Sequence, residues 1–136
     1  MGITIITDSG SDIKQEIAKK WGIRVLPLTV RFGDEEFLDD VTLTADQMYK
    51  RMIETGELPK TSQVPPYLFE LAFRDEVEKG NTVICITTSS GMSGCYHSAC
   101  IAARHFPGKV TVIDSLNVCA SLYVLVRYAE GLVRMG

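Results

Sequence analysis

The chain has 136 residues, which is long enough for one domain that buries a substantial core. Its hydrophobic content of 46% and charged content of 23% are typical of a soluble globular protein. The net charge of −3, without a basic run or stripe, makes nucleic acid a poor candidate partner.

The sequence shows no targeting pattern. The first ten residues lack the charged and long apolar regions of a signal peptide, and the longest apolar stretch, at 118–126, is far too short to span a bilayer. The four cysteines show no paired spacing, so we expect reduced thiols. These features together predict a cytoplasmic protein without stable membrane insertion.

Strands and helices alternate along the chain. Short β-rich runs predict strands at 3–7, 23–32, 82–88 and 109–114, with a short extended piece at 33–40. Helices are predicted from Ser11 or Asp12 to about Trp21, behind Thr44 to about Thr55, from Pro65 to Gly80, at about 94–105 and at about 117–135. This alternation predicts one α/β domain over residues 1–136, with helices on both faces of a mostly parallel sheet in three layers.

Local signals sharpen some of these boundaries. Pro27 cannot donate to a ladder, so the strand at 23–32 is expected at a sheet edge or with a bulge. Thr44 and Gln47 have the spacing of a capping box, and Gly22 is placed to end the first helix.

Small hydroxyl residues and glycines follow three of the predicted strands. They lie in the loops at 7–12, 87–94 and 114–121, and the turn expected at 60–63 could reach the same edge. Ligands of open parallel sheets bind in such loops, and the start of the helix near Ser93 offers oriented N–H donors to an anion. The same residue types also serve only to cap helices and turn corners. Both interpretations remain open at this point.

Five segments carry a resemblance to a known family. They are "TDSGSDI", "VLPLTVRFGDEEFLDD", "PKTSQVPP", "SSGMSGCYHSA" and "VTVIDS". In order and spacing they resemble the DegV family along all 136 residues. The resemblance implies a DegV-like N-terminal α/β domain that binds a long-chain, palmitate-like fatty acid. It implies that Thr61, Ser62 and Ser93, with the backbone at Gly94, hold the carboxylate.

The resemblance also implies a role without catalysis. DegV-family carriers present the bound fatty acid to a separate fatty acid kinase for phospholipid synthesis, so we expect no cofactor and no catalytic residues here. Seven apolar residues are candidates for lining the tail or for ordinary core: Leu28, Val30, Phe32, Tyr67, Phe69, Phe73 and Tyr96.

The chain departs from the family pattern in length and at a few positions. DegV proteins are about twice as long, and their second half closes the pocket and contributes basic side chains, so its absence predicts a face free for self-association. Cys95 stands where the family usually has threonine. Cys119, Ser121 and Tyr123 replace a serine and spaced glycines, and the ring of Tyr123 is expected to crowd the ligand or a neighbouring backbone.

Other functions fit the sequence less well. A serine hydrolase using Ser93 would draw its partners from His97 or His105 and Asp8 or Asp114, but the final glycine of a nucleophile elbow is missing. Cys95, His97, Cys100 and His105 spread around one helix, which argues against a metal site. Asp8 and Asp114 are assigned structural roles. A ligand-free or phosphate-binding interaction domain is the remaining alternative.

Overall fold

The computed structural model describes residues 2–136 and contains two sheets. The larger sheet has four parallel strands in the order β2–β1–β6–β7. Their bounds are Ile3–Asp8 for β1, Arg24–Leu26 for β2, Thr82–Thr87 for β6 and Val110–Asp114 for β7. All four carboxyl ends therefore lie at the same edge, as the sequence predicted.

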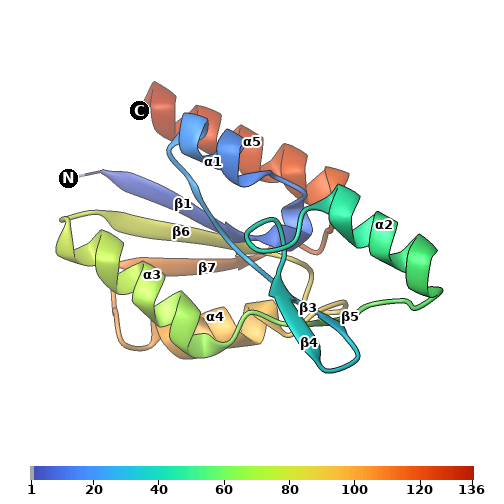
Figure 1. The fold of residues 1–136 in the computed structure, drawn as a ribbon. Coiled ribbons are helices and arrows are strands. Elements are labelled where there is room, and N and C mark those ends of the chain that lie inside the picture. Colours follow the sequence, from blue (N-terminus) through green and yellow to red (C-terminus); the bar gives the residue numbers. More distant parts are fainter. Residues whose placement is uncertain (1) are drawn as a thin grey trace.

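Helices cover both faces of this sheet, which confirms the predicted three-layer α/β/α class. Figure 1 shows α1 (Gln15–Trp21) and α5 (Ala120–Met135) on one side, and α3 (Pro66–Glu78) and α4 (Cys95–Ala103) on the other. Ile5 of β1 belongs to the apolar cluster beneath α1 and α5, whereas Ile6 belongs to the cluster beneath α3 and α4. This alternation follows from the two-residue period of a strand.

The second sheet was not predicted. Its strands β3 (Thr29–Phe32), β4 (Glu35–Leu38) and β5 (Lys60–Ser62) are antiparallel, in the order β4–β3–β5. The single strand expected at 23–32 is divided at Pro27, because the chain leaves the parallel sheet at Leu26 and the amide of Leu28 donates to Ser9 Oγ at 2.9 Å. The turn expected at 60–63 is instead strand β5.

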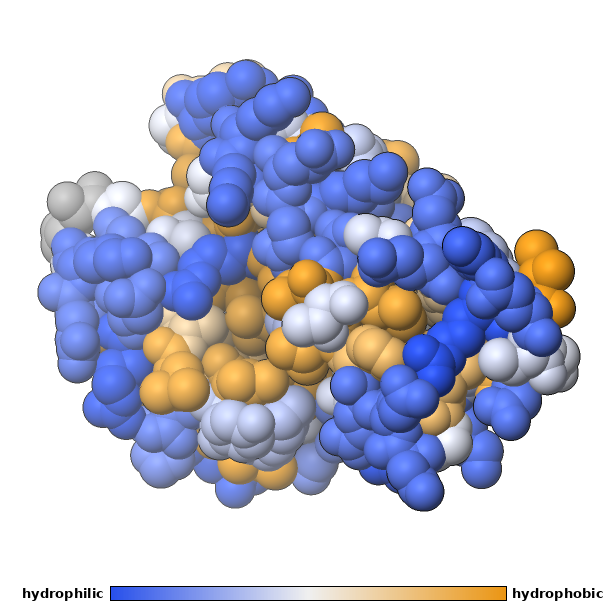
Figure 2. Space-filling model, in the orientation of Figure 1, coloured by the Kyte–Doolittle hydropathy of each residue, from blue (hydrophilic) through white to orange (hydrophobic). Residues whose placement is uncertain are grey.

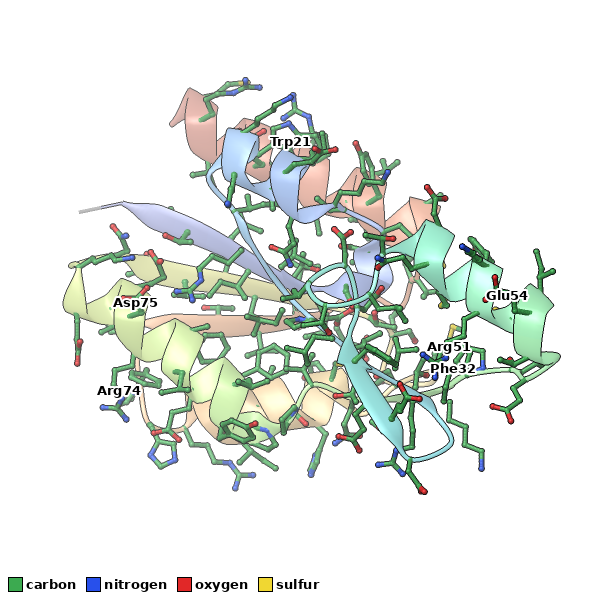
Figure 3. The ribbon with its side chains drawn as sticks, viewed as in Figure 1. Trp21, Phe32, Arg51, Glu54, Arg74 and Asp75 are labelled. Atoms are coloured by element: carbon green, nitrogen blue, oxygen red, sulfur yellow. The ribbon has the colours of Figure 1, made fainter. Side chains whose placement is uncertain are left out.

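Helix α2 (Ala45–Thr55) packs on the small sheet. Its capping box is present as predicted, with Gln47 N donating to Thr44 Oγ1 and the Gln47 side chain accepting from Thr44 N. The Arg51 guanidinium lies 5.1 Å from the centre of the Phe32 ring and ion-pairs with Glu35 at 2.6 Å (Figure 3). This contact attaches α2 to β3 and β4.

The start of α1 differs from the prediction. Residues 9–11 form a separate short 3₁₀ turn, η1 (Ser9–Ser11), and Asp12 adopts the left-handed conformation with φ of 56°. The helix begins only at Gln15, whose amide donates to Asp40 Oδ2 at 2.8 Å. The cap therefore comes from a residue 25 positions away, which no local pattern could indicate. Gly22 ends the helix as expected, with φ of 67°.

The buried carboxylate of Glu76 ties the end of α3 to the large sheet. Its oxygens accept from Thr4 Oγ1 of β1 at 2.8 Å and from Asn81 Nδ2 at 3.0 Å, and they pair with Arg24 of β2 and with Lys79. Burial on its own raises the pKa of Glu76, but the hydrogen bonds from Asn81, Thr4 and Lys79 outweigh it and leave the pKa below its ordinary value.

Replacing Glu76 with glutamine tests this contact. We expect Glu76→Gln to lower the free energy of unfolding at pH 7 by about 1–3 kcal/mol, because an amide cannot accept from all these donors. A carboxyl whose folded pKa is lowered stabilises the fold above its unfolded pKa and loses this contribution as the pH falls through the folded pKa. Urea unfolding of both proteins should therefore show a stability difference that shrinks below about pH 4.5. A difference that is constant between pH 7 and pH 3 would contradict this role.

Among residues 2–136, no helix is both long enough and apolar enough to cross a membrane.

Candidate functional site

The loops at the carboxyl edge of the sheet are joined by the buried carboxylate of Asp8. Asp8 Oδ1 accepts from Gly10 N at 2.9 Å and from Thr88 Oγ1 at 2.5 Å, and its Oδ2 accepts from Thr88 N at 2.7 Å. Burial raises the pKa of Asp8, and the bonds from Thr88 and Gly10 oppose that rise. Asp8 thus connects the loop after β1 to the loop after β6.

The second polar junction lies where the segment after β5 meets the start of α4. Val64 N donates to Cys95 Sγ at 3.4 Å, and Gln63 Nε2 donates to Ser98 Oγ at 3.1 Å. The Gln63 amide occupies the space that a side chain at Gly94 would need, since a Cβ built there would lie 1.6 Å from Gln63 Oε1. These contacts hold the segment after β5 against the start of α4.

All four predicted site residues lie on these two adjoining segments. Thr61 and Ser62 are exposed on β5, and Ser93 and Gly94 are half-buried just before α4. Gly94 provides no side-chain cap, so the first turn of α4 keeps backbone donors with no partner within the helix. Ser93 Oγ accepts from Cys95 N at 3.3 Å, and a serine hydroxyl also carries one proton to donate. Hydroxyls and a helix N-terminus of this kind suit an anion.

Gln63 is a residue of this junction that the sequence analysis missed. Its neighbours Thr61 and Ser62 were singled out for their hydroxyls, whereas Gln63 makes its contacts across 31 to 35 positions of sequence with Gly94 and Ser98. No local pattern links these positions.

Cys95 has a structural role in this junction. It is fully buried, and burial followed by the charge of Asp8 raises the pKa of its thiol to about 11. The thiol therefore stays protonated at neutral pH and is a poor nucleophile. Its sulfur accepts the Val64 amide, a bond that the hydroxyl of a threonine could also make.

The geometry does not assemble a hydrolase. His97 is exposed, and His105 Nε2 lies 3.9 Å from Glu70 Oε2 rather than near Ser93. Asp114 Oδ1 accepts from the amides of Ser90 and Leu116, which is the structural role predicted for it.

The possible metal ligands of the described residues are likewise not clustered. Over residues 2–136, no group of three or more His, Cys, Asp and Glu side chains is arranged to hold a metal ion.

The apolar residues near the junction divide into core and surface. Phe69 and Phe73 are fully buried with ring centres 5.8 Å apart, and Val30 and Phe32 form the core of the small sheet. Leu28, Tyr67 and Tyr96 keep exposed surface. Figure 2 shows a band of apolar side chains crossing the middle of the visible face, from α3 towards the small sheet. An acyl chain could contact this band.

Two cavities lie elsewhere. One of about 660 Å³ lies between the first turns of α1 and α2 and is lined by several acidic residues, among them Asp12, Asp39 and Asp40. The other, of about 480 Å³, lies between α1 and the last turns of α5. Neither is lined by Thr61, Ser62, Ser93 or Gly94.

The crowding expected from Tyr123 does not occur at this junction. Its ring packs edge-on against Trp21 at 5.5 Å between ring centres, in the apolar cluster beneath α1 and α5. Cys95 and Val64 belong to the cluster on the opposite face of the sheet. The bulky side chain is therefore accommodated away from the predicted head-group residues.

These features define an open α/β protein with a candidate anion-binding junction at the carboxyl edge of its parallel sheet. The family described as "Uncharacterised protein, DegV family" matches residues 2–136, so the chain belongs to the DegV family. It is 39% identical over 135 residues to a DegV domain-containing protein of Clostridium perfringens, covering 98% of this chain and 48% of that protein. It is 44% identical over 125 residues to a DegV domain-containing protein of Clostridium acetobutylicum, covering 91% of this chain and 45% of that protein.

Solved structures show the same fold. A fatty-acid-binding DegV family protein from Thermus thermophilus matches with a TM-score of 0.90 and 33% identity, over 100% of this chain and 49% of that one. A stearic acid-binding protein from Eubacterium ventriosum matches with a TM-score of 0.89 and 32% identity, over 97% of this chain and 47% of that one. The Fatty Acid Kinase B3 protein of Streptococcus pneumoniae, loaded with linoleic acid, matches with a TM-score of 0.81 and 28% identity, over 100% of this chain and 50% of that one. The chain thus spans about half the length of these relatives.

Two glycine substitutions should lower the free energy of unfolding by different amounts. Gly94→Ala pushes only the mobile end of the Gln63 side chain, so we expect it to break the Gln63–Ser98 hydrogen bond and lower the free energy of unfolding by about 1 kcal/mol.

The matched variant Gly10→Ala places its methyl group 2.1 Å from Thr88 Oγ1 and 2.8 Å from Asp8 Oδ1, both buried. Disrupting that bonded carboxylate should cost about 3 kcal/mol or more. Denaturant titration should show a larger loss of unfolding free energy in Gly10→Ala than in Gly94→Ala. An equal loss in both variants would show that the Asp8 contacts are not rigid.

Proposed function

We propose that this domain binds a long-chain fatty acid, with the carboxylate held by Thr61, Ser62 and Ser93 and by the backbone at Gly94. The observation that carries the proposal is the junction of β5 with the start of α4, where these residues lie on two adjoining segments. Membership of the DegV family supports the ligand class, since two of its structural neighbours are described as binding fatty acids.

The head group would be bound by neutral donors and a helix dipole. The hydroxyls each offer one O–H, and the first turn of α4 adds oriented N–H groups and a partial positive charge. In this proposal the domain holds the carboxylate without transforming it, in keeping with neighbours described as fatty-acid-binding proteins.

The tail would supply most of the binding free energy. Burial of each CH₂ is worth about 0.8 kcal/mol, so a palmitate-like chain gains on the order of 10 kcal/mol before ordering costs. Leu28 and Leu68 are half-buried beside the cluster that contains Val64 and Cys95, and they provide apolar surface next to the head-group residues. Thr61 and Ser62 are exposed, so full burial of the ligand requires additional cover from the half of the DegV length that this chain does not span.

A carrier role follows from an accessible head group. Because the candidate donors lie at the surface, a second protein could reach the carboxylate while the tail stays bound. The similarity to a Fatty Acid Kinase B3 protein loaded with linoleic acid supports presentation of the fatty acid to a kinase in lipid metabolism.

Lipid retention tests the head-group residues. Organic extraction of the purified protein followed by mass spectrometry should yield a stoichiometric long-chain fatty acid. The double variant Thr61→Ala with Ser93→Ala should bind palmitate at least about tenfold more weakly, because it removes hydrogen bonds to a charged group. Thr111→Ala removes an exposed strand hydroxyl of β7 and serves as the matched control.

Circular dichroism establishes that each variant is folded. Undiminished palmitate binding by the folded double variant would contradict the head-group assignment. A wild-type protein that is empty on extraction and does not bind added palmitate would contradict fatty-acid binding by this domain alone.

A further inference from the structure

Two unpaired lysines lie at the cavity between α1 and the last turns of α5. Lys19 and Lys20 are exposed residues of the last turn of α1, and both line this cavity of about 480 Å³. Within residues 2–136, no carboxylate forms an ion pair with either of them, and the ion pairs that lysines do form lie on α2 and at the end of α3. Both ammonium groups can therefore bind an anion that comes from outside the chain.

A buried carboxylate holds two arginines beside the same cavity. Glu130 of α5 is buried in the cavity wall and forms ion pairs with Arg127 and with Arg134, whose Nε lies 3.7 Å from Glu130 Oε1. The Arg127 guanidinium also lies 4.8 Å from the centre of the Trp21 ring, at the junction of α1 and α5 (Figure 3). Arg134 turns Nε towards Glu130, and its other guanidinium donors have no hydrogen-bond partner within the described residues.

The rest of the cavity wall is largely aliphatic. Ile5 and Ile23 are buried and Val133 is half-buried. Ile3, which also lines the cavity, keeps 47% of its surface exposed, so solvent reaches this apolar wall. Ligand sites typically combine an apolar lining with a few polar groups that fix the orientation of the ligand. This cavity therefore suits a molecule that has an aliphatic body and an anionic group.

The charge balance at the cavity favours a doubly charged group. The two lysines and two arginines outnumber the single carboxylate of Glu130, which leaves a charge of +3. The other acid of α1, Glu16, lines the other cavity. Basic residues also offset the negative ends of helices, but the C-termini of α1 and α5 contribute only about −0.5 each. About two positive charges remain, in a chain whose net charge is −3. A phosphate monoester carries about −1.5 to −2 at pH 7, whereas a carboxylate carries a single charge.

We propose that this cavity binds a phosphate monoester with an aliphatic body. Lys19, Lys20 and Arg134 bind the phosphate, and the three isoleucines and the valine of the wall contact the aliphatic body. Glu130 is a positioning residue, because its ion pair orients Arg134.

The proposed phosphate site is separate from the candidate fatty-acid site. The cavity lies where β1 begins and α1 ends, at the amino edge of the large sheet, near both chain termini in Figure 1. The candidate head-group residues lie at the carboxyl edge, and none of them lines this cavity. The proposal therefore goes beyond fatty-acid binding and does not depend on it.

Tryptophan fluorescence tests the proposal, because Trp21 is the single tryptophan of the chain and lines the cavity. Titration with monomeric octyl phosphate should give a saturable change in the fluorescence of Trp21, matched by heat in calorimetry. Inorganic phosphate lacks the aliphatic body, and octyl sulfate has the same body with a single charge. Each should bind at least about fivefold more weakly than octyl phosphate.

Lysine variants locate the site. The double variant Lys19→Gln with Lys20→Gln should bind octyl phosphate at least about tenfold more weakly, because it removes two of the cations that face the phosphate. The matched control Lys14→Gln with Lys109→Gln removes the same net charge from two exposed positions outside the cavity and should bind as the unchanged protein does. Circular dichroism establishes that both double variants are folded.

Four results would overturn the proposal. The first is the absence of both a saturable fluorescence change and heat with octyl phosphate. The second is equal weakening in the two lysine double variants, which would indicate attraction by net charge alone. The third is binding of inorganic phosphate as tight as that of octyl phosphate, which would exclude a role for the aliphatic wall.

The fourth result separates this proposal from fatty-acid binding. The variant Thr61→Ala with Ser93→Ala should bind octyl phosphate as the unchanged protein does, since neither residue lines the cavity. Loss of octyl phosphate binding in this variant would place the ligand at the candidate fatty-acid site instead. A failure to retain or bind palmitate would leave all the octyl phosphate expectations unchanged.

Discussion

A single buried carboxylate fixes the edge of the sheet on which the candidate site depends. Asp8 lies at the end of β1 and bonds the loop after β6 through both the amide and the hydroxyl of Thr88. The adjoining Gly10 carbonyl accepts from Cys119 N at 2.7 Å, at the start of α5. The loops after β1, β6 and β7 are thereby connected through Asp8 and its neighbour Gly10. Desolvation of such a group is costly, and its three hydrogen bonds are what make the burial tolerable.

The candidate site itself requires both sheets. The large sheet supplies the start of α4, with Ser93 and Gly94, whereas the small sheet supplies β5, with Thr61 and Ser62. The two parts are brought together because the chain changes sheet at Pro27 and because Gln63 and Val64 bond residues of α4. The candidate site is therefore a property of the contact between the sheets, and either sheet by itself would present only scattered hydroxyls.

The parts of the fold that could be predicted are those with local causes. The capping box of Thr44 and Gln47, the end of α1 at Gly22 and the four parallel strands all follow from patterns within a few residues. The division at Pro27 depends on Ser9, the start of α1 depends on Asp40, and β5 is an exposed three-residue strand with no apolar period. For the site, residue types and a helix N-terminus were visible in the sequence. Gln63 was not, because its partners are distant in sequence.

The contact between Gln63 and Gly94 has a consequence for how this sequence can change over evolution. The Gln63 amide fills the volume that a larger residue at position 94 would enter, so the preference for glycine comes from its neighbour and not from its own backbone, whose φ of −79° is open to most residues. A shorter side chain at position 63 would remove that preference. The two positions should therefore vary as a pair among homologous sequences, with larger residues at 94 confined to chains that lack a long side chain at 63.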